Sequence, residues 1–287
     1  MVSLSQRLFR LLCFKEPRWP HKDRSETFQA NFKSTNLYFQ RLGNQVDFRD
    51  KTVLDVGCGS GSACLYIAQQ GARQVVGIDI NATALAEAQE RLAKNYSDLA
   101  DRVTYTLISQ PKQLGDQKFD IILSKDSFEH IDNPKQYLEC LEEYVADDGI
   151  IIIGFGPLWK SPWGPHITYM TRFPWVHLLF SERTIMQVRL RMINPADKAE
   201  TYAQVAGGLN QMTLKKFNSI LKESNLEPVY FKTNVHDKPL AKVFDVLRRI
   251  PGCEEYFTFN LYSIWRLKTA RKENATVPSA VTSSSAH

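Results

Sequence analysis

The sequence lacks the features of disulfide-rich, zinc-binding and membrane-spanning proteins. Its five cysteines are scattered and odd in number, with no CxxC pair and no histidine at zinc-ligand spacing, so neither a disulfide framework nor a metal site is predicted. No apolar run approaches the roughly 18 residues of a membrane span. Arg7 and Arg10 interrupt the apolar N-terminus, which therefore does not resemble a signal peptide. These absences favour a reducing, cytoplasmic compartment.

Positive charge is scarce in the body of the chain, although the formal net charge is +5. Residues 1–33 hold seven basic and three acidic side chains, and residues 268–287 hold three and one, so residues 34–267 carry a net charge of −1. A polyanion is bound by a basic stripe across a domain, and this body has none. A nucleic-acid partner is therefore not expected.

Residues 51–155 alternate short apolar runs with helical patterns, which is typical of βαβ units around a parallel sheet. Strands are predicted at 51–56, 72–80, 102–108, 119–124 and 149–155, and helices at 60–70, 82–96 and 133–146. Regular patterns resume with helices at 212–225 and 240–250 and strands at 227–235 and 255–268. The whole pattern predicts an α/β protein with a doubly wound, Rossmann-like sheet.

Composition divides the chain into five parts. We predict an N-terminal helical cap (1–50), a ligand-binding core (51–155), an aromatic insertion (156–205), the C-terminal part of the sheet (206–268) and a disordered tail (269–287). The insertion holds three of the five tryptophans, whereas the tail is made of small and polar residues that cannot build a core.

The most informative segment is VLDVGCGSG at 53–61, where a buried strand leads through three glycines into a helix. Glycine lets the backbone turn sharply and lets a ligand lie against it, because no Cβ intervenes. The dinucleotide fingerprint requires glycine or alanine at position 62, which here is Ser62. A nicotinamide-dependent oxidoreductase is therefore a weaker alternative.

Two acidic residues define the ligand further. Asp55 precedes the glycines, where a carboxylate would repel a pyrophosphate and attract an ammonium group. Asp79 ends the following strand, near the offset from the glycines at which a carboxylate accepts hydrogen bonds from ribose hydroxyls. Together these residues predict a phosphate-free adenosine compound with a cationic amino-acid end.

These segments resemble known motifs. VLDVGCGSG at 53–61 and VVGIDI at 75–80 are similar to the first two motifs of class I S-adenosylmethionine-dependent methyltransferases, and FDIILSKDSFEHIDNP at 119–134 resembles the fourth-strand region of the UbiE/Coq5-like small-molecule branch. The resemblance implies S-adenosylmethionine as the cofactor. It also implies a seven-stranded sheet of order 3-2-1-4-5-7-6, with the last strand antiparallel.

The same resemblance implies roles for residues at one edge of the sheet. Asp55 and the loop would line the methionine end of the cofactor, Asp79 would hold the ribose, and Ile80 would lie against the adenine. The loop residues are Gly57, Cys58, Gly59, Ser60 and Gly61. Beside the adenine would lie Ser109 and Gln110, where many relatives have an acid, and facing the methyl donor would be Ser124, Lys125 and Asp126.

Methyl transfer from a sulfonium uses a donor that is already activated, so the protein mainly has to align the reactants. A base is needed only for an acceptor that enters protonated, such as a phenol or an alcohol. The candidate catalytic bases are His130, after the fourth strand, and His166, in the insertion. Each has a structural alternative: a local role for His130 in the Glu-His pair, and a surface role for His166 on a lid.

The aromatic insertion follows the fifth strand, near the edge where open α/β sheets bind ligands. We predict that it forms an apolar lid over a small apolar or aromatic acceptor. The candidate acceptor-binding residues are Trp159, Trp163, His166, Tyr169 and Trp175. A dimer contact or ordinary core is the alternative. Oxygen, nitrogen and carbon acceptors all remain open.

The first 14 residues have four leucines at helical spacing, with Arg7 and Arg10 between them. The favoured interpretation is a helix that caps its own pocket, and the alternative is contact with an anionic membrane surface. Aromatic residues continue this helical cover toward the sheet, at Phe28, Phe32, Tyr38 and Phe39.

A second class of function fits the same sequence. A non-catalytic module would keep the cofactor fold and use the aromatic insertion to hold a partner. Nucleic-acid amino methyltransferases carry an Asn/Asp-Pro-Pro-Tyr/Phe turn after the fourth strand, whereas this chain has Ser124-Lys125-Asp126-Ser127. A nucleic-acid substrate is therefore not expected.

Overall fold

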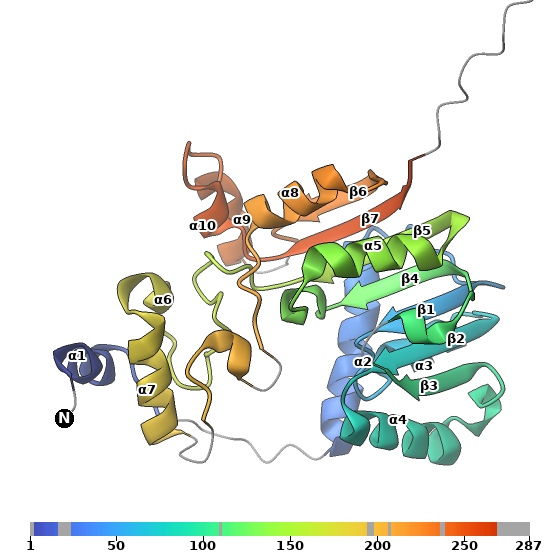
Figure 1. Cartoon of the computed structure of the whole chain (residues 1–287), viewed down its shortest axis with the longest axis horizontal. Helices are drawn as coiled ribbons and strands as arrows, with labels where there is room; N and C mark the ends of the chain where they lie inside the picture. Colours follow the sequence, from blue (N-terminus) through green and yellow to red (C-terminus); the bar gives the residue numbers. More distant parts are fainter. Residues whose placement is uncertain are drawn as a thin grey trace, which may run out of the picture.

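A computed structural model describes residues 3–16, 24–108, 111–193, 198–205, 208–235 and 239–268. Seven strands form one sheet in the order β3-β2-β1-β4-β5-β7-β6 (Figure 1). They are β1 (Thr52–Val56), β2 (Gln74–Asp79), β3 (Val103–Leu107), β4 (Phe119–Lys125), β5 (Val145–Phe155), β6 (Leu226–Thr233) and β7 (Leu261–Leu267). β7 runs antiparallel to both β5 and β6, and the other pairs are parallel. The predicted Rossmann-like sheet and its order are confirmed.

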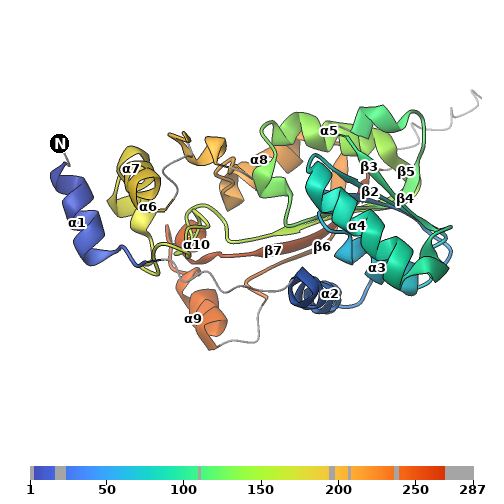
Figure 2. The ribbon, with the colours of Figure 1, turned by 90° about the horizontal axis from the view of Figure 1, so that it is seen from below.

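Helices cover both faces of the sheet. One face carries α2 (Arg24–Arg41), α3 (Ser62–Gln69) and α4 (Ala82–Asn95), and the other carries α5 (Pro134–Tyr144) and α8 (Leu214–Glu223). Figure 2 shows α5 and α8 on one side of the strands and α2 on the other. Successive strand residues alternate between the two cores, because side chains of a strand point to opposite faces.

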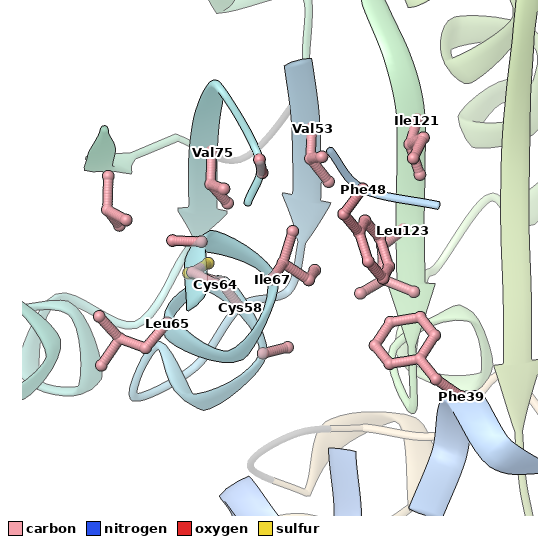
Figure 3. Close-up of a cluster of buried hydrophobic side chains, with 14 of the residues drawn as sticks. Phe39, Phe48, Val53, Cys58, Cys64, Leu65, Ile67, Val75, Ile121 and Leu123 are labelled. Carbon is pink, nitrogen blue, oxygen red and sulfur yellow. The ribbon is translucent and has the colours of Figure 1, made fainter. Parts of the chain in front are cut away.

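The core under α2 and α3 explains why the predicted strands consist of apolar residues. Val53, Val75 and Ile121 point from three neighbouring strands toward the same side, where Phe39 of α2 and Ile67 of α3 meet them (Figure 3). Each fully buried side chain of this size contributes about 1.5–3 kcal/mol. This packing fixes the position of the β1–α3 turn between them.

Local capping signals set the helix starts. Asn81 accepts a hydrogen bond from the Ala84 backbone N–H at 3.1 Å and begins α4. Asn133 does the same for α5, whose first residue is proline. Thr213, predicted as the cap of the later helix, accepts from the Lys216 N–H at 3.1 Å. That prediction is confirmed.

The insertion builds a third core of its own. It contains α6 (Val176–Leu179) and α7 (Glu182–Met192), and α1 (Leu4–Leu12) packs on α7. Phe9 of α1 meets Phe180 edge-on, with ring centroids 5.2 Å apart. Figure 1 shows this insertion unit, made of α1, α6 and α7 with the connecting segments, to one side of the sheet. The predicted N-terminal cap is therefore divided: α2 covers the sheet, whereas α1 belongs to the insertion unit.

The remaining elements are short. They are α9 (Pro239–Leu247), α10 (Glu254–Phe257), and four 3-10 helices: η1 (Ser97–Leu99), η2 (Pro111–Leu114), η3 (Phe128–His130) and η4 (Tyr202–Gln204). β7 begins at Leu261, later than predicted, because α10 occupies the first part of the predicted strand. Across the described ranges, no helix is both long enough and apolar enough to cross a membrane. The predicted tail at 269–287 lies outside these ranges.

Candidate cofactor and acceptor site

The glycine loop joins β1 to α3 at the carboxyl edge of the sheet. Gly57, Gly59 and Gly61 all have positive φ, at 79°, 53° and 78°. A Cβ at Gly57 would lie 2.6 Å from Ser127 Oγ, and one at Gly61 would lie still closer to the Tyr105 hydroxyl, so both positions exclude a side chain. A Cβ at Gly59 would meet nothing within 4 Å. The loop is therefore packed on its inner side and open at Gly59, where a ligand can lie against the backbone.

Asp79 holds this loop from the end of β2. Its two oxygens accept hydrogen bonds from the backbone N–H groups of Gly59 and Asn81, both at 2.8 Å. A carboxylate has about four acceptor sites, so it can still accept from two ribose hydroxyls. Ile80 is 75% exposed beside it, and Leu107 at the end of β3 is 56% exposed. These two side chains offer an apolar surface to a purine ring.

Asp55 lies beneath the loop and not on it. Its side chain is 2% exposed and accepts a hydrogen bond from Cys64 Sγ at 3.2 Å. Burial raises the pKa of this carboxyl to about 6, because the charged form loses its hydration. The expectation that Asp55 lines the ligand surface is corrected: its charge can act on a cationic ligand only through the loop.

The other predicted cofactor residues are spread over three environments. Cys58 is buried and points toward Cys64 in the core (Figure 3), so only its backbone faces the loop surface. The Ser60 carbonyl accepts a hydrogen bond from Arg91 at 3.2 Å. Ser124 is fully buried, whereas Lys125 and Asp126 line a cavity. Ser109 and Gln110 lie outside the described residues.

A cavity of about 510 Å³ lies at the carboxyl ends of β4 and β5. Its walls come from α2, both strand ends, the insertion, α9 and the start of β7, with aromatic and apolar side chains predominating. Among the residues that line it are Tyr38, Arg41, Lys125, Asp126, Phe155, Trp163, Phe244 and Tyr262. Lys125 Nζ lies 2.9 Å from Asp126 Oδ2, so these two charges form an ion pair in the wall.

The predicted acceptor residues do not all face this cavity. Trp163 lines it, but His166 and Tyr169 line a second cavity of about 140 Å³. Trp159 packs against His177 and Tyr202, and Trp175 packs against Phe257. The single-lid prediction is thereby corrected, because Trp159 and Trp175, both half-buried, contact rings of other segments, and His166 and Tyr169 line a different cavity.

Two predicted catalytic residues do come together. His130 and His166 have ring centroids 5.8 Å apart, and Glu129 Oε1 lies 4.0 Å from His130 Nε2. Glu129 is 3% exposed, and burial raises its carboxyl pKa to about 8. Burial also lowers the pKa of His166, so its neutral form is favoured. Ligand-type atoms of all three residues lie within 4.8 Å of one another, an arrangement that can share a proton or hold a divalent cation.

Comparison with known proteins bears on this geometry. Residues 54–151 match a family model described as a methyltransferase domain. The ubiquinone biosynthesis O-methyltransferase of Neisseria meningitidis serogroup C is 29% identical over 142 residues, which cover 49% of this chain and 58% of that protein. The mitochondrial enzyme of the same name from Dictyostelium discoideum is 32% identical over 108 residues, which cover 35% of this chain and 34% of that protein. The chain thus matches only part of the length of these relatives.

Solved structures share the fold. A putative S-adenosylmethionine-dependent methyltransferase from Listeria monocytogenes aligns with a TM-score of 0.53 at 16% identity, over 81% of this chain and 98% of that one. The cyclase SpnF aligns with the same score and identity, over 89% and 87%. Residues 54–151 thus match a methyltransferase domain, and the sheet around them has the fold of S-adenosylmethionine-dependent methyltransferases. The predicted resemblance to S-adenosylmethionine-dependent, UbiE/Coq5-like methyltransferases is confirmed.

The methyltransferase domain fits S-adenosylmethionine on its own geometry. The open backbone at Gly59 leaves room for the ligand. The Asp79 carboxylate offers acceptors for ribose hydroxyls, and the exposed Ile80 offers an apolar surface for adenine. These residues would hold the cofactor. The 510 Å³ cavity is linked to this loop along the chain, because Ser127 follows the cavity residues Lys125 and Asp126, donates from its Oγ to the Val56 carbonyl at 2.9 Å and lies against Gly57.

Several cavity residues were missed by sequence reasoning. Tyr38 was predicted only as helical cover, and Arg41, Phe244 and Tyr262 were not predicted to have any role. They come from α2, α9 and β7, which lie near opposite ends of the chain. No local motif marks them, because their only common property is a position that the folded chain creates.

Proposed function

We propose that this protein transfers a methyl group from S-adenosylmethionine to a small apolar or aromatic acceptor. The observation that carries the proposal is the contact between the two halves of the site. Ser127 touches the glycine loop, and its neighbours Lys125 and Asp126 line the 510 Å³ cavity. That volume falls in the range of small-molecule pockets.

Alignment is the main task of the protein in this proposal. The bound cofactor supplies an activated methyl group, and alignment of two reactants can be worth about 7–11 kcal/mol. Phe155, Trp163 and Phe244 provide apolar walls that orient an acceptor and exclude water from the cavity. Lys125 and Asp126, at the end of β4, stand between the acceptor and the cofactor loop.

We further propose His166 and His130 as the groups that take a proton from an acceptor that enters protonated. The lowered pKa of His166 keeps its ring neutral near pH 7 and able to accept a proton, and His130 lies beside it with ring centroids 5.8 Å apart. His166 Nε2 is also 3.2 Å from the carbonyl of Pro157, a residue of the acceptor cavity. The pair thus lies directly behind the cavity wall.

The relatives support an oxygen acceptor. The ubiquinone biosynthesis enzymes named above are O-methyltransferases, and so is a probable tocopherol O-methyltransferase of Oryza sativa, 31% identical over 128 residues. A ribosomal protein L11 methyltransferase of Colwellia psychrerythraea is 32% identical over 108 residues. The cavity walls favour a small acceptor over a protein one, because they surround the ligand with apolar side chains.

The test uses purified protein, S-adenosylmethionine labelled in the methyl group, and fractions of a cell extract. Label should pass to an organic-soluble metabolite, and Asp79→Asn should lower affinity for the cofactor product S-adenosylhomocysteine by about tenfold or more in calorimetry. Binding without transfer to any fraction would instead support a non-catalytic module that keeps the cofactor fold.

We also propose that α1 touches an anionic membrane surface, as one of the two sequence interpretations holds. Leu4, Leu8, Leu11 and Leu12 are 74%, 42%, 80% and 64% exposed on its outer face, and Arg7 and Arg10 flank them. Exposed leucines beside arginines are typical of helices that lie in the lipid headgroup layer. None of the residues lining either cavity comes from α1. The cytoplasmic location and the absence of a nucleic-acid partner stay predictions.

A further inference from the structure

Resting on the proposed function, we infer that the acceptor is an apolar or aromatic organic acid, and that its anionic group binds Arg41 in the large cavity at the ends of β4 and β5. Three observations support this: an arginine without an acidic partner, a buried tyrosine hydroxyl without a partner, and the apolar character of the surrounding walls.

Arg41 is the last residue of α2 and lines the cavity. Its Nη1 donates to the Tyr262 hydroxyl at 2.8 Å, and its guanidinium carbon lies 5.8 Å from the centre of the Tyr262 ring. Its Nε is buried and has no hydrogen-bond partner among the residues that the structure describes. Among the ion pairs of the described residues, none includes Arg41.

The other charges of the cavity compensate one another. Lys125 and Asp126 form an ion pair at 2.9 Å, so Arg41 is the one charge of the described cavity wall without a counterion. A partly buried cation without an anionic partner is unfavourable, because it gives up hydration and gains no ion pair in return. A ligand that brings an anionic oxygen removes this cost, whereas a neutral ligand does not.

Tyr38 provides a second donor on the same helix, one turn before Arg41. The side chain is 3% exposed, and within the described part of the chain its hydroxyl has no hydrogen-bond partner. Burial raises the tyrosine pKa well above its ordinary value, so the group remains a hydroxyl donor. Its ring lies 5.2 Å from that of Tyr262, to which Arg41 is bonded. Tyr38 and Arg41 therefore line the same cavity from one helix, and each contributes a donor there.

The rest of the wall selects an apolar body for the ligand. Phe155, Trp163, Phe244 and Phe259 line the cavity from β5, the insertion and the segment around α9 and β7. A carboxylate attached to an aromatic or aliphatic body matches this division of the cavity into a cationic wall and apolar walls. The same chemistry is present in the methionine carboxylate of the cofactor, so a test must distinguish the two sources.

The experiment compares naphthalene-2-carboxylate with 2-naphthamide, a neutral molecule of nearly the same shape, by calorimetry with and without S-adenosylhomocysteine. The carboxylate should bind the wild-type protein about tenfold more tightly than the amide. Arg41→Met should bring the two affinities within about twofold, and Arg41→Lys should retain part of the preference. Lys33→Met, which removes an exposed charge from the same helix, should change neither affinity.

The titrations distinguish failure of this inference from failure of the proposed function. Equal affinities in the wild-type protein, or no binding of either probe, overturn the inference. An Arg41→Met protein that loses affinity for S-adenosylhomocysteine by about tenfold while keeping the probe preference assigns Arg41 to the cofactor carboxylate and also overturns it. Failure of S-adenosylhomocysteine to bind the wild type is a failure of the proposed function, and the probe titrations without it still decide the inference.

Discussion

The cofactor edge and the insertion unit are built by different rules. At the cofactor edge, the glycine loop and Asp79 are close together in the sequence, and the Asp79 carboxylate accepts a hydrogen bond from the backbone N–H of Gly59. In the insertion unit, α1 packs on α7 although the two helices are far apart in the chain, through side chains such as Phe9 and Phe180. The first region depends on residue types at fixed spacing, whereas the second depends on which surfaces meet after the chain has folded.

The largest expected effect sharpens this contrast by asking whether the insertion takes part in chemistry. His166→Asn should lower kcat by about 100-fold with a protonated acceptor and leave KM nearly unchanged, because only proton removal is lost. The burial that lowers the pKa of His166 should keep the wild-type rate high at pH values below 6.5, where an ordinary histidine would be protonated. A pH–rate profile of both proteins measures this.

Controls for this variant come from the same unit. Phe173→Leu alters an exposed residue of the insertion that lines neither the acceptor cavity nor the histidine cavity, so turnover should be unchanged. EDTA should have no effect on wild-type transfer, in keeping with the prediction of no metal. Loss of activity with EDTA that zinc or magnesium restores would show that Glu129, His130 and His166 bind a metal. An unchanged kcat in His166→Asn would remove this residue from the mechanism.

The second prediction tests how tightly the cofactor edge is packed. Gly61→Ala places a Cβ against the Tyr105 ring at a positive φ, and should lower the free energy of unfolding by about 2–3 kcal/mol. Gly115→Ala is the matched control, since Gly115 has a φ of 68° and open space around it, and should cost only about 1 kcal/mol. Urea unfolding measures both, and equal losses would contradict the tight packing of the loop.

The third prediction concerns the charge beneath the loop. The folded-state pKa of Asp55 is about 6 against 3.8 for a free carboxyl, so the folded protein binds this proton more tightly than the unfolded chain does. Its contribution to stability is therefore full below pH 4 and falls as pH rises through 6, by about 3 kcal/mol. Asp55→Asn should remove this fall, so the stability of the variant relative to the wild type should be higher at pH 8 than at pH 4.

For the same variant, cofactor affinity should fall although stability at pH 8 rises relative to the wild type. Asp55→Asn removes a negative charge near the predicted binding position of the ammonium group, so S-adenosylhomocysteine should bind more weakly. Melting temperature against pH and calorimetry together provide the measurement. A variant that melts at a lower temperature than the wild type at pH 8, with unchanged affinity, would show that Asp55 has a packing role only.

The smallest expected effect concerns the outer surface of the insertion unit. Replacing Leu11 and Leu12 of α1 by serine should reduce binding to phosphatidylserine-containing vesicles several-fold, since each exposed leucine contributes apolar area to the headgroup layer. The folded state should be little affected, because the buried contacts of α1 are made by Gln6 and Phe9. Sedimentation with vesicles measures the binding. Equal sedimentation of both proteins, or none, would argue against the membrane contact.

Much of the cofactor edge was predictable because its determinants are local. The positions of Gly57 and Gly61 in the turn and of Asp79 at the end of β2 agree with the spacing and with the alternation of strands and helices, whereas their cofactor roles stay predictions. Asp55 shows where this reasoning stops: the residue type was informative, but whether its carboxylate faced the ligand or the core depended on Cys64 and the packing of α3.

The acceptor side was less predictable. Aromatic richness marked the insertion, yet among the predicted aromatic side chains Trp163 lines the large cavity, while the half-buried Trp159 and Trp175 pack against other rings. A segment of this length must bury apolar surface to remain folded, and composition does not tell which side chains serve that purpose and which remain for a ligand.

The sequence by itself determined the sheet and the glycine loop with Asp79 at the end of the next strand, because these follow from periodicity and from residues at fixed spacing. The strand order came from the family resemblance. Only the tertiary structure decided that α1 joins the insertion, that His130 meets His166, and that Arg41 stands without a counterion in the cavity wall. Those facts arise from side chains distant in the chain, whose contacts are set by the combined packing of all elements and not by any one segment.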